Sequence, residues 1–222
     1  MRKSSPRALD LAQLALFGAI VIVLAFTPFV GYIPLGITKA TIIHIPVMIG
    51  SILLGPKKGA VLGALFGMTS LISNTIAPTL ASFTFSPFYS GGNFWSLVVC
   101  FVPRVLVGVV PYFVYRGIKK LQKNKKASET VALALAGLAG SMTNTLLVMN
   151  LIFVFFRDSY AQVKGLAADA LYGFILTVIG INGVPEAIVA MLLTTVIVKA
   201  LFRAGYRTKD GRFIPAERTD DP

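Results

Sequence analysis

The sequence predicts an all-α integral membrane protein: a six-transmembrane-helix bundle, N-in/C-in, with long outer loops between helices 1-2 and 3-4. Its composition is the first reason, since 55% of the 222 residues are hydrophobic, 14% are charged and the mean hydropathy is +0.77. Helical membrane bundles have this composition and soluble domains of this length rarely do. The distribution of positive charge is the second reason and fixes the orientation.

All but Lys39, Arg104, Arg157 and Lys164 of the 21 lysine and arginine residues fall in four clusters, which apolar stretches separate. The clusters are 2–7, 57–58, 116–126 and 199–218. Cytoplasmic loops carry an excess of Lys and Arg, so all four clusters are predicted to lie on the inner side. The chain then crosses the membrane an even number of times between clusters, which gives six crossings. This rule also explains the net charge of +12, and nucleic-acid binding is not indicated.

A membrane span needs about 20 apolar residues. The six predicted helices are Leu9–Thr27, Thr41–Leu54, Ala60–Ile76, Trp95–Tyr115, Thr130–Phe156 and Asp169–Phe202. The second is short, so we expect it to be tilted or partly covered by the outer loop 28–41. The sixth is long enough to contain a break at Gly183-Val184-Pro185, because proline cannot donate a helical hydrogen bond. Residues 1–206 thus form one membrane domain and 207–222 a polar cytoplasmic tail.

The outer loop 77–93 contains no charged residue and is rich in aromatic ones. Irregular backbone close to a membrane must be covered by protein or line a cavity. The loop is therefore predicted to be a lid or binding loop, with Phe83, Phe85 and Tyr89 as candidate substrate contacts. An interfacial aromatic belt is the alternative interpretation.

Ionisable residues inside membrane spans are costly and are candidates for function. His44, Arg104 and Glu186 are three such residues, and Asn144 is a fourth polar residue at similar depth. Each lies about 18–22 Å from the predicted inner face, at 1.5 Å per residue. Asn182 shares a face of the last helix with Glu186. These five residues are the candidate substrate-binding groups.

Less specific explanations exist for the same residues. Arg104 and Glu186 can pair with each other and hold two helices together, and a buried pair is weak evidence for stability. His44 can be an ordinary interior histidine. Asn144 shares a face with Ser141 and Thr145, and that face can serve only to join helices.

No catalytic or metal-binding pattern is present in the sequence. There is no Ser/His/Asp arrangement, HExxH motif, aspartate pair or phosphate-binding loop, so ATP hydrolysis by this chain and enzymatic activity in general are not predicted. Cys100 is the single cysteine, and no Cys/His cluster suggests a metal.

Two patterns of small residues indicate close helix packing. The first helix contains two AxxxA pairs, Ala8/Ala12 and Ala15/Ala19. A four-step glycine ladder leads into the third helix, at positions 55, 59, 63 and 67. Each pattern can serve packing inside the bundle or form a smooth docking face for another membrane subunit.

Three segments in this order resemble the substrate-binding S component of energy-coupling factor (ECF) vitamin transporters. They are ALFGA at 15–19, IPVMIG at 45–50 and the turn GPKKGA at 55–60. The loop segment APTLASFTFSPF at 77–88 is most similar to the pantothenate-type branch.

The resemblance implies a multi-pass cell-membrane subunit that binds a vitamin with high affinity and has no cofactor of its own. Its partners would be a membrane scaffold subunit, reached through the AxxxA helix, and two ATPases that use the ATP. Arg104 would then suit the carboxylate of an anionic vitamin.

Other interpretations stay open. The ligand can instead be a pyridoxine- or hydroxymethylpyrimidine-type compound or folate. The chain can also be a self-sufficient carrier in which Arg104 and Glu186 couple transport to protons.

Overall fold

The computed structural model describes residues 6–27, 32–34, 39–121, 126–204, 206–209 and 212–215. Parts of the first basic cluster, the first outer loop, the 116–126 cluster and the tail 207–222 lie outside these residues. The helices are α1 (Pro6–Phe26), α2 (His44–Leu54), α3 (Pro56–Ile76), α4 (Phe94–Val107), α5 (Val110–Leu121), α6 (Lys126–Lys164), α7 (Leu171–Val178) and α8 (Val184–Arg203). A 3-10 turn spans Ser82–Thr84 and a π-helical turn spans Ile179–Gly183.

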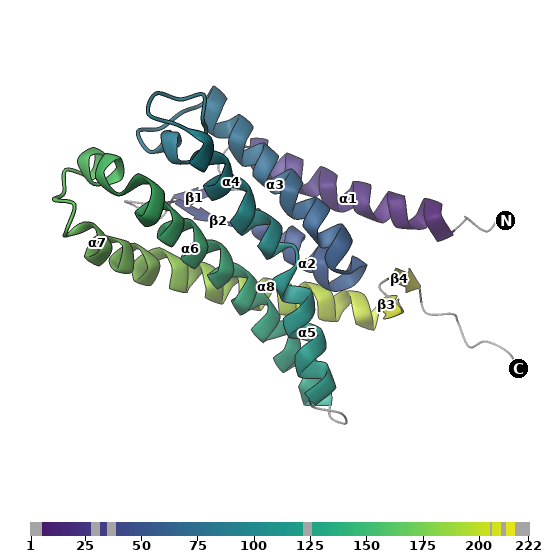
Figure 1. Ribbon diagram of the computed structural model, residues 1–222. Coiled ribbons are helices and arrows are strands. Elements are labelled where there is room, and N and C mark those ends of the chain that lie inside the picture. The colour runs from purple at the N-terminus through teal and green to yellow at the C-terminus, as the bar shows by residue number, and fades with distance from the viewer. Residues whose placement is uncertain are drawn as a thin grey trace, which may run out of the picture.

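The helices form an elongated bundle, in which the start of α1 and the end of α8 lie at the same end (Figure 1). Two short antiparallel hairpins accompany them: β1 (Tyr32–Pro34) with β2 (Lys39–Thr41), and β3 (Tyr206–Lys209) with β4 (Arg212–Pro215). The second hairpin lies in the segment predicted to be a polar tail and contacts α2 and α8. The sequence predicts an all-α protein, and neither hairpin is expected from it.

Five helical segments in the described part of the chain are long and apolar enough to cross a membrane. They are Ala8–Phe26, Pro56–Ile76, Phe94–Leu121, Glu129–Lys164 and Leu171–Arg203. The remaining apolar helix, α2, has only 11 residues. The helical membrane bundle is therefore confirmed, whereas the six crossings and their orientation stay predictions.

Several predicted boundaries are wrong, and packing explains the clearest case. The predicted helix Trp95–Tyr115 is two helices, α4 and α5, which meet at Gly108 and Val109. A Cβ atom on Gly108 would lie 2.0 Å from the Gly59 carbonyl oxygen, so the two backbones touch there. Pro111, in the first turn of α5, also lacks the N–H that a continuous helix would use.

Helix α3 begins at Pro56 and not at Ala60, because proline suits the first position of a helix. The segment 157–168 was predicted to be a loop, yet α6 continues to Lys164 beyond a kink at Phe156 (φ −132°, ψ 23°). The Phe156 ring is buried against Phe83, which places the kink at an aromatic contact.

The predicted break in the last helix is confirmed and begins before Pro185. A π-helical turn, Ile179–Gly183, separates α7 from α8. Since proline has no N–H, the carbonyl four residues earlier loses its helical partner and the backbone widens locally.

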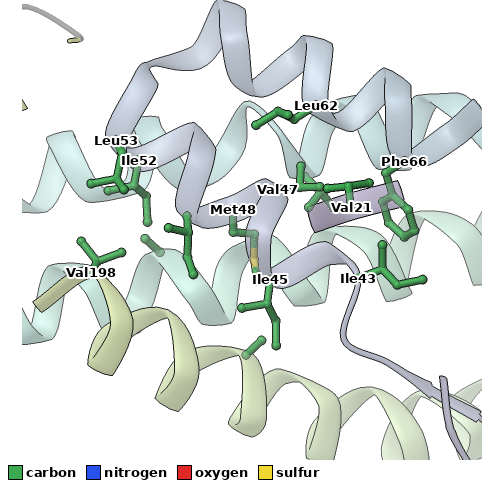
Figure 2. Close-up of a cluster of buried hydrophobic side chains, with 14 of the residues drawn as sticks. Val21, Ile43, Ile45, Val47, Met48, Ile52, Leu53, Leu62, Phe66 and Val198 are labelled. Atoms are coloured by element: carbon green, nitrogen blue, oxygen red, sulfur yellow. The ribbon is translucent and has the colours of Figure 1, made fainter. Parts of the chain in front are cut away.

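Two hydrophobic clusters stabilise the bundle. The central core surrounds α2, every residue of which is buried, and α2 contacts α1, α3, α4, α5, α6 and α8. Figure 2 shows α2 side chains such as Met48 and Ile52 surrounded by Val21, Phe66 and Val198 from three other helices. The loop core joins loop 77–93 to α4, α6 and α7, and its buried members are Phe83, Val99, Val148, Ile152, Phe156, Tyr160, Ala161, Leu171 and Ile175.

Candidate substrate-binding site

Arg104 is buried and lies where the two cores meet. Its residue exposure is 7%. The guanidinium carbon is 5.6 Å from the ring centroid of Phe66, a central-core residue, and 5.0 Å from that of Phe85 in loop 77–93. One guanidinium nitrogen, Nη1, donates to the Val99 carbonyl at 2.8 Å. Aromatic faces and a carbonyl thus replace part of the water that a buried charge loses.

Glu186, near the start of α8, has a different partner. Its carboxylate accepts a hydrogen bond from the backbone N–H of Thr41 in β2. Among the residues that the structure describes, the ion pair formed is Lys58–Asp10, and Arg104 and Glu186 are not paired with each other. Glu186 therefore holds the β1–β2 hairpin to α8, and β2 also contacts the π-helical turn.

His44 is the first residue of α2 and lies three residues after Thr41. It is 1% exposed and lies close to the backbone of Thr41. The charge of Arg104 acts on the imidazole, which places the two predicted site residues near each other.

A polar face of α6 lies beside the π-helical turn. Ser141 and Thr145 are buried, as is Asn182 in the turn. A Cβ atom on Gly183 would lie 2.7 Å from Thr145 Cγ2, so α6 and the turn touch. Asn144 is half-buried on this side of α6.

Several buried polar atoms of these elements have no protein partner among the described residues. They include the Ser141 hydroxyl and the Asn144 side-chain oxygen. Leaving a buried polar atom unpaired costs about 1–3 kcal/mol, so such groups normally bind water or a ligand. The two α6 atoms are therefore candidates for contact with a polar ligand.

Loop 77–93 is fastened to the helices by three serine hydroxyls. Ser82 donates to the Asn74 side-chain oxygen at 2.8 Å, and Ser86 bonds the Thr75 hydroxyl at 2.8 Å. Ser96 at the start of α4 donates to the Phe83 carbonyl at 2.6 Å. The loop is therefore attached to α3 and α4 by specific hydrogen bonds.

The apolar residues of loop 77–93 differ in burial. Phe83 is buried against Phe156, with centroids 5.6 Å apart, and Tyr89 packs half-buried on the loop core. Leu80 and Phe88 are 73% and 77% exposed, as an interfacial belt requires. Of the three aromatic residues predicted to contact the substrate, Phe85 is the one whose ring lies against the Arg104 guanidinium.

Sequence reasoning missed Phe66 and Thr41. Phe66 is an apolar residue in an apolar helix, and nothing in its spacing distinguishes it from other core residues. Thr41 takes part through its backbone N–H, which no side-chain pattern reveals. No group of three metal-ligating side chains occurs within the described ranges.

The two small-residue patterns have different surroundings. Positions 59, 63 and 67 of the glycine ladder lie against Gly108, Arg104 and Phe101, so they serve packing inside the bundle. The residues of the AxxxA pairs, Ala8, Ala12, Ala15 and Ala19, are all exposed. These four residues form one surface of α1, the alanine face.

Comparisons with known proteins agree with this architecture. The family described as "ECF transporter, substrate-specific component" matches residues 9–198. The pantothenic acid transporter PanT of Lactococcus lactis subsp. cremoris is 40% identical over 210 residues, which cover 92% of this chain and 98% of that protein. The pantothenate transporter PanT of Leuconostoc mesenteroides is 28% identical over 187 residues, covering 82% and 86%.

Two solved structures share the fold. One is the S component of a bacterial ECF transporter, with a TM-score of 0.50, 15% identity and coverage of 89% of this chain and 95% of that one. The other is the S component for biotin from an ECF-type ABC transporter, with a TM-score of 0.51, 20% identity and coverage of 92% and 96%. At these identities the likeness concerns the fold alone.

Proposed function

The chain belongs to the family of substrate-specific (S) components of ECF transporters, and we propose that it is the subunit that binds pantothenate for an ATP-driven importer. Members of this family are membrane transporter components and not enzymes, and this chain is a multi-pass membrane protein. The relative that is 40% identical over nearly its whole length supports pantothenate as the vitamin.

In the proposed arrangement the chain crosses the membrane six times with both termini in the cytoplasm. The crossing formed by α2 is about 16 Å long, shorter than the hydrocarbon core. Because α2 is enclosed by other helices, it needs no contact with lipid. The common end of α1 and α8 and the four basic clusters support this orientation.

The buried Arg104 is the observation that carries the proposed site. Pantothenate has one carboxylate, an amide and two hydroxyls. A guanidinium recognises a carboxylate through charge and paired hydrogen bonds. The Ser141 and Asn144 oxygens, which have no partner among the described residues, suit the amide and hydroxyl groups, and His44, Glu186 and Asn182 are further polar candidates of the proposed site. Phe85, with Phe83 and Tyr89 behind it, covers the site from loop 77–93.

The proposed partners are a membrane scaffold subunit and two ATPases that use the ATP, while this chain needs no cofactor. The alanine face of α1 is the proposed docking surface. Its small side chains are exposed and let another helix approach closely.

Calorimetric titration of the purified chain in detergent tests the proposal. We expect tight one-to-one binding of pantothenate and none of pyridoxine, hydroxymethylpyrimidine or folate. Arg104→Ala is expected to weaken pantothenate binding at least about tenfold, equivalent to about 1.4 kcal/mol. Arg157→Ala, which removes an exposed arginine of α6, is the matched control and should bind normally.

Unchanged affinity in a folded Arg104→Ala variant would contradict the assigned site. If the folded wild-type protein binds none of the four vitamins, a self-sufficient carrier becomes the better hypothesis. Flux into liposomes that contain this chain and no ATPase would then support that alternative.

A further inference from the structure

Helix α3 contacts Arg104 at its backbone as well as at its side chain. A Cβ atom on Gly63 would lie 2.2 Å from the Arg104 carbonyl oxygen, so α3 and α4 pack without a side chain between them there. Phe66 follows Gly63 by three residues, on the same face of α3. It is 2% exposed and its ring faces the guanidinium. One face of α3 therefore positions both the backbone and the charged end of Arg104.

Neighbouring contacts fix the register of the two helices. The Cys100 thiol, one turn before Arg104, donates to the Gly67 carbonyl at 3.3 Å. A Cβ atom on Gly67 would lie 2.8 Å from the Phe101 ring. Sliding α4 along α3 would break these contacts, so Arg104 stays opposite Phe66.

The second ring on Arg104 depends on α3 as well. Phe85 precedes Ser86, whose hydroxyl bonds Thr75 near the end of α3. Ser82, three residues before Phe85, bonds Asn74 in the same turn of α3. Phe66 is thus part of α3, and Phe85 belongs to a loop that is hydrogen-bonded to the end of α3.

A long arginine side chain normally loses conformational freedom when it binds a ligand. Stacking on aromatic rings removes that freedom in advance, and it leaves the edge of the planar guanidinium to make hydrogen bonds. Binding to such a preorganised group costs less entropy. The benefit applies to a ligand that uses the charge and not to one that lacks it.

We propose that Phe66 and Phe85 form an aromatic clamp, a pair of positioning residues that hold Arg104 for the substrate carboxylate and so create the preference for a carboxylate over a neutral ligand. This inference rests on the proposed function, because it needs Arg104 to meet the carboxylate. It assigns to Phe66 a role in ligand selection that its place in the central core does not reveal.

The test compares pantothenate with pantothenyl alcohol, in which a hydroxyl replaces the carboxylate. Titration calorimetry gives both dissociation constants for the wild type and for Phe66→Leu, Phe85→Leu and Arg104→Ala. We expect the wild type to prefer pantothenate at least about tenfold. Each leucine variant should bind pantothenate about fivefold more weakly or worse and bind the alcohol within about twofold of wild type.

Two further variants separate positioning from packing. Phe85→Tyr keeps a ring at the half-buried position and should retain most of the preference. Phe174→Leu removes a ring that lies near Lys164 and not near Arg104, and should leave the preference unchanged. In the double variant Phe66→Leu/Arg104→Ala, the loss of pantothenate affinity should equal that of Arg104→Ala alone, because the clamp acts through Arg104.

The outcomes distinguish the clamp from the site. If Phe66→Leu and Phe85→Leu weaken the binding of pantothenate and of pantothenyl alcohol by the same factor, the clamp is overturned, because the two rings then have only a structural role. The clamp also fails alone if Arg104→Ala removes the preference while the leucine variants keep it. If Arg104→Ala keeps the preference, the proposed site itself fails. Should Phe66→Leu not fold, Phe85→Leu decides, because its loop position is only half-buried.

Discussion

Helices α1 and α2 are both almost entirely apolar, yet they occupy opposite environments. Every residue of α2 is buried by protein. Along the described part of α1, the buried residues are Gly18, Val21 and Ala25, a narrow stripe at helical spacing. Leu14, Phe17 and Leu24 are half-buried against the central core, and the alanine face is exposed.

The difference shows that the hydropathy of a helix indicates an apolar environment but does not tell whether lipid or other helices provide that environment. Lipid tails are as apolar as a protein core, so a helix that faces lipid and one that faces other helices can have the same composition. Length separates them here, since the 21 residues of α1 are enough to span the hydrocarbon core in contact with lipid, whereas the 11 residues of α2 form a shorter helix that other helices enclose. The buried α2 can carry a site residue, His44, while the exposed α1 is available to a partner.

The largest effect that would sharpen this comparison concerns the alanine face. Ala15→Leu/Ala19→Leu is expected to abolish pantothenate uptake in cells that contain the complete transporter, because bulky side chains keep a partner helix away. Pantothenate binding by the isolated chain should stay within about twofold, since both residues are exposed on the outside of α1. Ala200→Leu, at an exposed alanine of α8, is the matched control. Normal uptake by the double variant would remove α1 as the docking helix.

A matched pair of isoleucines tests the two environments directly. Ile52 of α2 is 0% exposed and Ile22 of α1 is 42% exposed. We expect Ile52→Ala to destabilise the protein by about 2–5 kcal/mol, because it leaves a cavity in the central core. Ile22→Ala should change stability by no more than about 0.5 kcal/mol. Thermal unfolding in one detergent measures both, and equal shifts would show that the two helices are not in different environments.

The smallest expected effect concerns the ion pair that joins α1 to the start of α3, the helix that follows α2. Lys58 Nζ, at the start of α3, lies 3.0 Å from Asp10 Oδ1 of α1, with side-chain exposures of 25% and 24%. Partly exposed ion pairs contribute about 0–1 kcal/mol to stability, so Asp10→Asn should lower the free energy of unfolding by no more than about 1 kcal/mol. The difference should shrink in high salt. A salt-independent loss above about 2 kcal/mol would mean that this pair, and not the buried stripe, attaches α1.

Much of the fold could be predicted from the sequence because the membrane imposes strong local constraints. Apolar segments must form helices in lipid, and basic residues mark their ends. The break before Pro185 follows from a missing N–H, which is a property of one residue. The interior ionisable residues His44, Arg104 and Glu186 stood out for the same reason, since such residues are costly in an apolar segment.

Tertiary structure alone decided the features that depend on which helix faces which. The separation of α4 from α5 arises where Gly108 meets Gly59, a contact between positions 49 residues apart in the sequence. The partners of Arg104, Phe66 and Phe85, come from another helix and from a loop, and the acceptor for the Thr41 N–H comes from α8. Periodicity reveals the faces of a single helix but not the neighbour that each face will meet, because that choice minimises the free energy of the whole bundle.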